Sequence, residues 1–277
     1  MRRLWLLAFS LGYAFLPVHA QEQFDLLIRN GMVLDGTGAA ARRADVGIRG
    51  KRIVAVGDLR GATAARTVDA RGKYLVPGFI DVHTHTEEGL SDPQRKANLS
   101  YITQGVTTVV AGNCGSSPVD VGKTLTLWRT AGIGTNAALL VGHGTVRRSV
   151  IGNAQREPSA EELRKMKALV ETAMKDGAYG LSSGLFYEPG SFAKTDEVVE
   201  LARVAAQYGG IYASHVRDEG NYSVGVMAAV TEAIEVGRQA GLTTEVSHLK
   251  ALGPESWGLA PKLCALIEEA RARGQKV

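Results

Sequence analysis

Apolar and polar positions repeat with two periods along most of this chain. From residue 74 onward, six apolar runs of strand length are each followed by a segment that can form a helix. The runs are YLVPGFIDV (74–82), VTTVVAG (106–112), TNAALLVG (135–142), AYGLSS (178–183), GIYASH (210–215) and TTEVSH (243–248). Strands that alternate with helices predict a parallel sheet covered by helices, so we expect an α/β fold.

The intervening segments carry helix start and stop signals. In PSAEELRKMKALVETAMKDG (158–177), Ser159 and Glu162 have the spacing of a capping box, and Gly177 follows the predicted end. Six βα units fit either an open sheet or the front part of a (β/α)₈ barrel, which needs eight.

Residues 24–73 have a different pattern, with short alternating runs separated by turn residues. Asn30-Gly31 is a strong hairpin signal, and Gly50 and Lys51 stand between two further alternating runs. We therefore expect a small β module that ends near residue 73.

Residues 1–20, MRRLWLLAFSLGYAFLPVHA, have the pattern of a secretory signal peptide. Arg2 and Arg3 precede an apolar stretch, and residues 18–20 resemble a cleavage site. The stretch is short for a membrane span of ~20 residues, although an uncleaved anchor is the alternative. We expect a mature chain that begins near Gln21, is periplasmic or secreted, and has no stable membrane span.

Charge and composition narrow the expected partners. The formal net charge is only +4, and no basic stripe or aromatic platform is visible, so nucleic acid is not an expected partner. The hydrophobic content of 45% is ordinary for a globular chain.

Histidines gather at one predicted edge of the sheet. Beyond the signal region there are five, each at or just past the C-terminal end of a predicted strand: His83, His85, His143, His215 and His248. Barrel active sites lie at this edge. Taken singly, each histidine is more typical of a hydrogen-bonded residue at the end of a strand. Their presence at one edge of the sheet favours a functional site. His83 and His85, at positions i and i+2 of an extended chain, point to the same side.

Cys114 lies at the same edge, in VVAGNCGSSP (109–118). A disulfide to Cys264 is an alternative in an exported protein, but Cys264 is expected on the buried face of a helix. Thiolate and neutral imidazole together suit zinc. We therefore predict a metal site formed by one cysteine and four histidines: Cys114, His83, His85, His215 and His248. His143, in a Gly-His-Gly turn, is predicted to support a ligand or contact the substrate.

Five motifs together resemble the D-aminoacylase (N-acyl-D-amino-acid deacylase) branch of the amidohydrolase superfamily: GFIDVHTH, VVAGNCGSSP, GLSSGLFYEPG, ASHVRDEG and EVSHLKALG. The resemblance implies a metal-dependent (β/α)₈ TIM barrel with a small β-sandwich built from both chain ends. Residues 24–73 would form the N-terminal part of the sandwich. Residues 74–277 would form an incomplete barrel with about six of its eight βα units.

The resemblance also implies roles for the metal ligands. Cys114, His215 and His248 would form a tight zinc site, and His83 and His85 would contribute to a weaker second one. The cysteine would stand where most of the superfamily has a carboxylated lysine, which argues against hydantoinase-like relatives. The implied reaction is hydrolysis of an N-acyl-D-amino acid to a D-amino acid and a carboxylate.

Lys250 lies two residues after His248 and can point the same way, so it is a candidate for contact with the substrate carbonyl or carboxylate, and Tyr187 and Arg217 are similar candidates. For Tyr187 and Arg217 the alternative is a solvated loop residue or a local ion pair.

The catalytic aspartate of the family would lie beyond Val277. We therefore expect the isolated 277-residue chain to have little activity and, because two sheet edges lack partners, to be poorly soluble. The alternatives are an amidohydrolase of D-dipeptides or cyclic amides, and a truncated metal-binding fragment without turnover.

Overall fold

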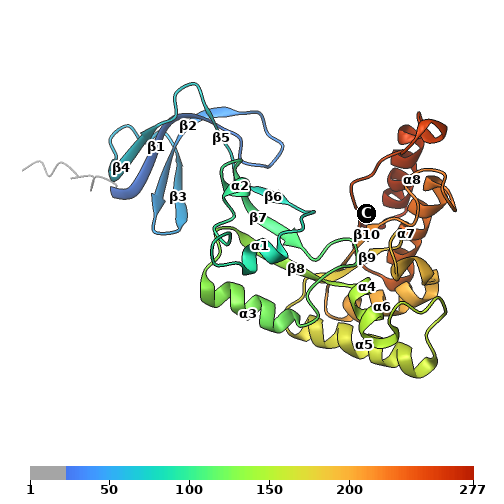
Figure 1. Ribbon diagram of the computed structural model, residues 1–277. Helices are drawn as coiled ribbons and strands as arrows, with labels where there is room; N and C mark the ends of the chain where they lie inside the picture. Colours follow the sequence, from blue (N-terminus) through green and yellow to red (C-terminus); the bar gives the residue numbers. More distant parts are fainter. Residues whose placement is uncertain (1–22) are drawn as a thin grey trace, which may run out of the picture. The chain divides into compact units, whose positions relative to one another are not determined.

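The computed structural model describes residues 23–277, which form two units, one ending at Pro77 and one running from Gly78 to Val277 (Figure 1). The break lies shortly after the boundary expected from the sequence. The predicted signal peptide, residues 1–20, lies outside the described residues. Among the helices of the described part, none is long and apolar enough to cross a membrane.

The first unit is a small sheet around β1. The strands are β1 (Gln23–Val33), β2 (Arg42–Arg49), β3 (Arg52–Gly57), β4 (Thr63–Asp69) and β5 (Tyr74–Leu75). The order is β3-β2-β1-β4, with β5 also paired to β1. The turn predicted at residues 50–51 joins the antiparallel strands β2 and β3 and is confirmed.

The hairpin predicted at Asn30-Gly31 is wrong. β1 runs through both residues, and its register against β2 shifts between Ile28 and Gly31. Asn30 has a φ of +63°. Its backbone N–H donates to Asp45 and its side-chain amide to Asp69, each at 2.9 Å. A bulge and a tight turn both need a residue that tolerates positive φ, so the dipeptide alone does not distinguish them.

The second unit contains the predicted parallel sheet. Its strands are β6 (Phe79–Asp81), β7 (Val106–Ala111), β8 (Asn136–Gly142), β9 (Gly180–Gly184), β10 (Ile211–His215) and β11 (Thr244–Val246). They lie side by side in chain order, and every neighbouring pair is parallel. The sheet curls as part of a barrel, with helices outside it (Figure 1).

The helices follow the strands as expected. They are α1 (Glu87–Ser91), α2 (Leu99–Ile102), α3 (Val121–Ala131), α4 (His143–Ile151), α5 (Ala160–Lys175), α6 (Thr195–Gln207), α7 (Val226–Ala240) and α8 (Ala260–Ala272), with short 3₁₀ turns at Gly190–Phe192 and Pro254–Ser256. The capping box of α5 is confirmed, because Ser159 Oγ accepts from Glu162 N–H while the Glu162 carboxylate accepts from Ser159 N–H.

Alternation along the strands divides the core into two parts. One set of strand side chains, which includes Leu139, Leu181 and Tyr212, joins the large cluster that also contains residues of α5 and α6. The other set forms a small cluster around Leu140 and Ala213. Because His215 follows Ala213 by two positions, we assign it to the same face of the curled sheet, at the carboxyl end of β10.

Both cysteines are free thiols, so the disulfide between Cys114 and Cys264 is not formed. The buried position predicted for Cys264 is wrong: this residue is exposed, and its neighbour Leu263 occupies the buried face of α8.

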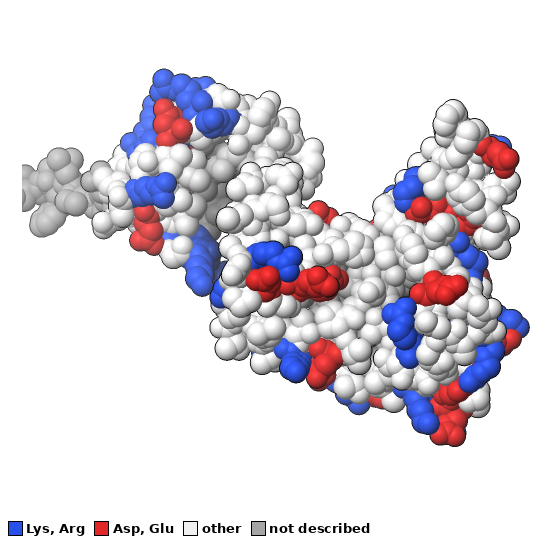
Figure 2. Space-filling view, viewed as in Figure 1, with Lys and Arg blue, Asp and Glu red and all other residues white. Residues whose placement is uncertain are grey.

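The charged surface is mixed. Lys and Arg lie among Asp and Glu on the face shown in Figure 2. Helix α5 contains two exposed ion pairs between neighbouring charges, Lys165–Glu161 and Lys175–Glu171. Such exposed pairs contribute little to stability, because water and salt screen them.

Candidate metal centre

The backbone around Cys114 is shaped by close approaches between loops. Cys114 has a φ of +54°, which is uncommon for a residue with a side chain. A Cβ added to Gly112 would collide with the carbonyl oxygen of Leu140, and one added to Gly184 with the carbonyl oxygen of Cys114. These two glycines therefore let the loop after β7 lie against the neighbouring strands.

Three donor atoms converge at the carboxyl edge of the sheet. Cys114 Sγ lies 3.4 Å from Nδ1 of His215 and 3.7 Å from Nε2 of His248. Zinc bonds of about 2.3 Å to sulfur and about 2.0–2.1 Å to nitrogen place tetrahedral ligand atoms about 3.5 Å apart. The donor spacing therefore fits one ion held between the three side chains.

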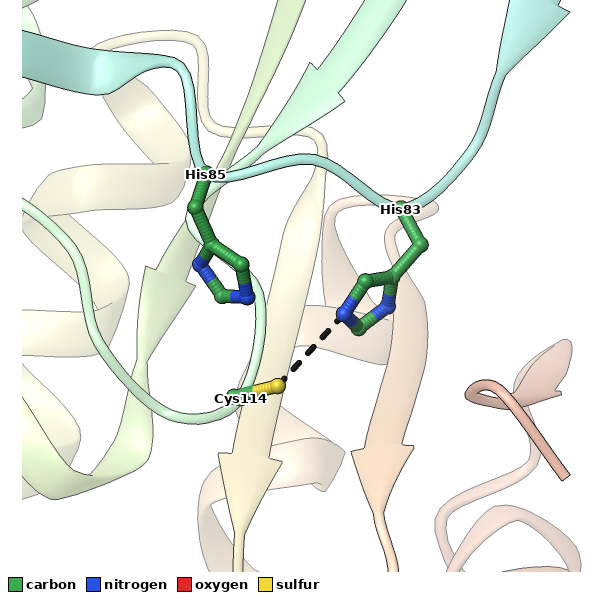
Figure 3. A group of neighbouring side chains, drawn as sticks. All are labelled: His83, His85 and Cys114. Carbon is green, nitrogen blue, oxygen red and sulfur yellow. Dashed lines mark hydrogen bonds between the residues drawn. The ribbon is translucent and has the colours of Figure 1, made fainter. Parts of the chain in front are cut away.

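His83 and His85 form a second donor group with the same cysteine. Both residues follow β6, and their imidazole rings point toward Cys114 (Figure 3). His83 Nε2 lies 3.5 Å from Cys114 Sγ, and the donor atoms of all three residues lie within 4.8 Å of one another. The structure thus brings together all five residues predicted as metal ligands, with the Cys114 sulfur common to both groups.

Burial favours neutral imidazoles at this edge. The pKa values of His83 and His215 are each lowered to about 4, mainly by desolvation. Desolvation, followed by the charge of Lys250, also lowers the pKa of His248. Because a neutral imidazole has a free lone pair, these rings are ready to bind a metal at neutral pH.

The thiol of Cys114 shows the opposite requirement. Desolvation raises its pKa to about 11, and the carboxylates of Glu219 and Glu245 act in the same direction. A thiolate at this position therefore needs an added positive charge beside it. A divalent metal ion supplies that charge and deprotonates a coordinating thiol, so the donor set fits a metal.

Glu219 is a site residue that the sequence analysis missed. Its Oε1 lies 3.4 Å from His215 Nε2 and 3.3 Å from His248 Nδ1, and it also contacts Lys250 Nζ. A signal was present in the motif ASHVRDEG, where an acidic residue stands four positions after a predicted ligand.

Lys250 and Tyr187, two of the predicted substrate contacts, lie next to the metal donors. Lys250 Nζ is 3.0 Å from His248 Nδ1. The Tyr187 ring centroid is 4.6 Å from that of His215. Tyr187 also borders a cavity of about 340 Å³ that reaches Cys114.

Arg217 is held in a local ion pair. Its guanidinium donates to both carboxylate oxygens of Glu232 at 2.8 Å, and to the backbone carbonyls of Ser191 and Ala193. This arrangement corresponds to the alternative that the sequence analysis left open.

His143 is also committed to a partner. Its ring has no exposed surface, and its Nε2 lies 2.8 Å from Oε1 of Glu197. The other carboxylate oxygen of Glu197 contacts the buried guanidinium of Arg147. His143 therefore belongs to a buried ionic cluster, and the structure does not place it among the metal donors.

Comparison with known proteins agrees with this architecture. The model of the Amidohydrolase family matches residues 66–263, so this chain belongs to the amidohydrolase family. It is 40% identical to a D-aminoacylase of Alcaligenes xylosoxydans xylosoxydans and 41% identical to an N-acyl-D-glutamate deacylase of the same organism. The matches cover 91% and 93% of this chain and 56% of each relative, so the chain spans little more than half their length.

Solved structures show the same relationship. A D-aminoacylase crystal structure has a TM-score of 0.85 and 40% identity, covering 92% of this chain and 57% of its own. The N-acyl-D-glutamate deacylase from Bordetella bronchiseptica, complexed with zinc and a phosphonate inhibitor, has a TM-score of 0.86 and 37% identity, covering 92% of this chain and 58% of its own. The predicted fold class, a partial amidohydrolase TIM barrel, is confirmed, as is the resemblance to D-aminoacylases.

Proposed function

We propose that the protein is a zinc-dependent N-acyl-D-amino-acid deacylase, which hydrolyses a linear amide to a D-amino acid and a carboxylate. The observation that carries the proposal is the convergence of Cys114, His215 and His248 on one point at the barrel edge. Similarity to a D-aminoacylase and to deacylases of N-acyl-D-glutamate and N-acyl-D-aspartate supports the substrate class.

Zinc is the metal that suits these donors. Cys114, His215 and His248 would hold it, and His83 and His85 would contribute to a second, weaker site next to Cys114. A related D-aminoacylase has a binuclear metal centre, which supports this arrangement. When bound, zinc polarises a carbonyl and lowers the pKa of a coordinated water.

The neighbouring side chains would orient the substrate. The Lys250 ammonium lies beside the donors and is placed to bind a carboxylate or an amide oxygen. Burial, followed by the charges of Cys114 and Glu219, raises the pKa of Tyr187, so its hydroxyl stays protonated and can donate a hydrogen bond. The adjoining cavity of about 340 Å³ has the size of a small-molecule site.

Enantiomer selectivity of the full-length protein tests this function. We expect release of the free amino acid from N-acetyl-D-methionine and none from the L enantiomer. A chelator should abolish the reaction, and zinc should restore it. Equal rates on both enantiomers would contradict the proposal, and faster hydrolysis of a D-dipeptide or a cyclic amide would favour the alternative amidohydrolase.

We also propose that the protein is exported to the periplasm or secreted, on the basis of the pattern in residues 1–20. Peptide mass spectrometry of the native product tests this. We expect a mature N-terminus near Gln21, whereas a product that retains Met1 would contradict it.

A further inference from the structure

Glu219 contacts both histidines of the Cys114 donor group through one oxygen atom. Oε1 lies 3.4 Å from Nε2 of His215 and 3.3 Å from Nδ1 of His248. These are the two ring nitrogens that do not face the sulfur, because Nδ1 of His215 and Nε2 of His248 do. The Glu219 side chain is only 11% exposed.

The loop after β10 holds this carboxylate in place. The neighbouring Asp218 accepts four hydrogen bonds from backbone N–H groups within residues 220–225. The backbone carbonyl of Glu219 accepts from Leu252 N–H at 2.7 Å. This last bond ties the loop after β10 to the loop after β11, so the segments that follow His215 and His248 are joined at Glu219.

An imidazole binds a metal through a nitrogen without a proton, so its other nitrogen carries the proton. A carboxylate that accepts from that N–H fixes the tautomer and the ring orientation, and it makes the metal-binding nitrogen more basic. Glu219 Oε1 lies within ion-pair distance of this nitrogen in both rings, 3.4 Å for His215 and 3.3 Å for His248, and is placed to accept from each when a metal is bound. The ammonium of Lys250 contacts the same oxygen and balances its negative charge, and it also lies 3.0 Å from Nδ1 of His248.

We propose that Glu219 is a positioning residue shared by His215 and His248, which holds both rings in the tautomer and orientation that bind the metal. It acts through the two rings. The inference rests on the metal site of the proposed function and not on its substrate.

Zinc affinity of the full-length protein, measured by competition with a chromogenic chelator, tests the proposal. E219Q keeps the size of the side chain and removes its charge, and we expect it to weaken zinc binding about 10- to 100-fold. Glu232 offers a matched control, because it is similarly buried at 13% exposure and pairs with Arg217. E232Q is expected to lower thermal stability without changing zinc affinity.

Cobalt substitution separates positioning from general stability. At saturating cobalt, E219Q should keep the thiolate-to-metal charge-transfer band of Cys114 but shift the ligand-field bands, because only the imidazoles have changed. E232Q should reproduce the wild-type spectrum. E219D keeps the charge on a side chain that is one methylene shorter, and its zinc affinity should lie between those of wild type and E219Q. This second variant provides the test if E219Q does not fold.

Wild-type zinc affinity in E219Q, an equal loss in E232Q, or an E219D affinity at or below that of E219Q would overturn the inference. The deacylase proposal can be contradicted independently of this inference. Weakened zinc binding in E219Q of a protein that hydrolyses no N-acyl-D-amino acid would support the role of Glu219 and contradict the function.

Discussion

Two histidines at the carboxyl ends of barrel strands have contrasting surroundings. His143, after β8, is fully buried and bonded to Glu197, which also contacts the guanidinium of Arg147. His215, at the end of β10, faces the thiol of Cys114 with a further imidazole beside it. In the first cluster opposite charges satisfy one another. In the second, electron-pair donors face a common point.

The contrast shows what a strand-end histidine does and does not indicate. Strand topology brings His143 and His215 to the same edge of the sheet, but the neighbouring side chains decide their roles. A carboxylate and a guanidinium give His143 a structural role, whereas a thiol and further imidazoles give His215 the surroundings of a metal ligand. Removal of Cys114, disruption of the buried cluster and exposure to acid test this distinction.

Removal of Cys114 should have the largest effect on metal binding, because its sulfur belongs to both donor groups. We expect C114A to lose more than the ~100-fold in zinc affinity that is typical of outer-sphere partners. Zinc content after dialysis measures this. C264A is a matched control, since Cys264 is an exposed free thiol, and it should retain wild-type zinc. One retained equivalent of zinc in C114A would remove the cysteine from the site.

Disruption of the buried cluster around Glu197 should lower the stability of the protein and leave its zinc affinity unchanged. E197Q leaves the buried Arg147 without its carboxylate partner, and we expect a loss of about 3–5 kcal/mol in the free energy of unfolding. Urea unfolding of the metal-free protein measures the loss. Zinc affinity should stay at the wild-type value, and a decrease comparable to that of C114A would contradict the distinction between the clusters.

Acid should weaken the same cluster. Burial raises the pKa of Glu197, but the hydrogen bonds and charges of His143 and Arg147 outweigh it, so the pKa lies below the ordinary 4.5. The ionised carboxylate therefore contributes its full stabilisation above about pH 4.5, and this contribution is lost as the pH falls through the lowered pKa. We expect unfolding free energies measured between pH 6 and 3 to decrease less steeply in E197Q than in wild type. Parallel curves would contradict this.

The order of strands and helices was predictable because it depends on short-range periodicity and on capping residues such as Ser159. The edge that carries the histidines was also predictable, because strand ends follow from the same pattern. Asn30-Gly31 was misjudged because a bulge and a hairpin share one backbone requirement. The predicted burial of Cys264 failed because helical spacing alone does not fix which side of α8 meets the core.

Other features depend on contacts between distant segments. The approach of Cys114 to His248 requires positive φ at both residues, +54° and +36°, and the absence of a side chain at Gly184. No hydrophobic pattern encodes these requirements. Glu219 was missed for a related reason, because its contact with His248 joins two loops whose packing becomes visible only in the folded chain.

The smallest effect is expected at a site remote from both clusters. S159A removes the N-cap of α5 and should cost about 1 kcal/mol, since Ser159 Oγ accepts the Glu162 N–H. Thermal unfolding measures this loss. S159G should lose less, and a larger loss in S159G than in S159A would contradict the capping role. Zinc affinity should remain unchanged in both variants.

X-ray absorption at the zinc edge of the zinc-loaded full-length protein tests the central claim most directly. With one zinc bound per molecule, we predict one sulfur at about 2.3 Å together with imidazole nitrogens at about 2.0–2.1 Å. This result would place Cys114, His215 and His248 around the ion. A shell of nitrogen and oxygen alone would contradict a cysteine-bound metal and the site proposed here.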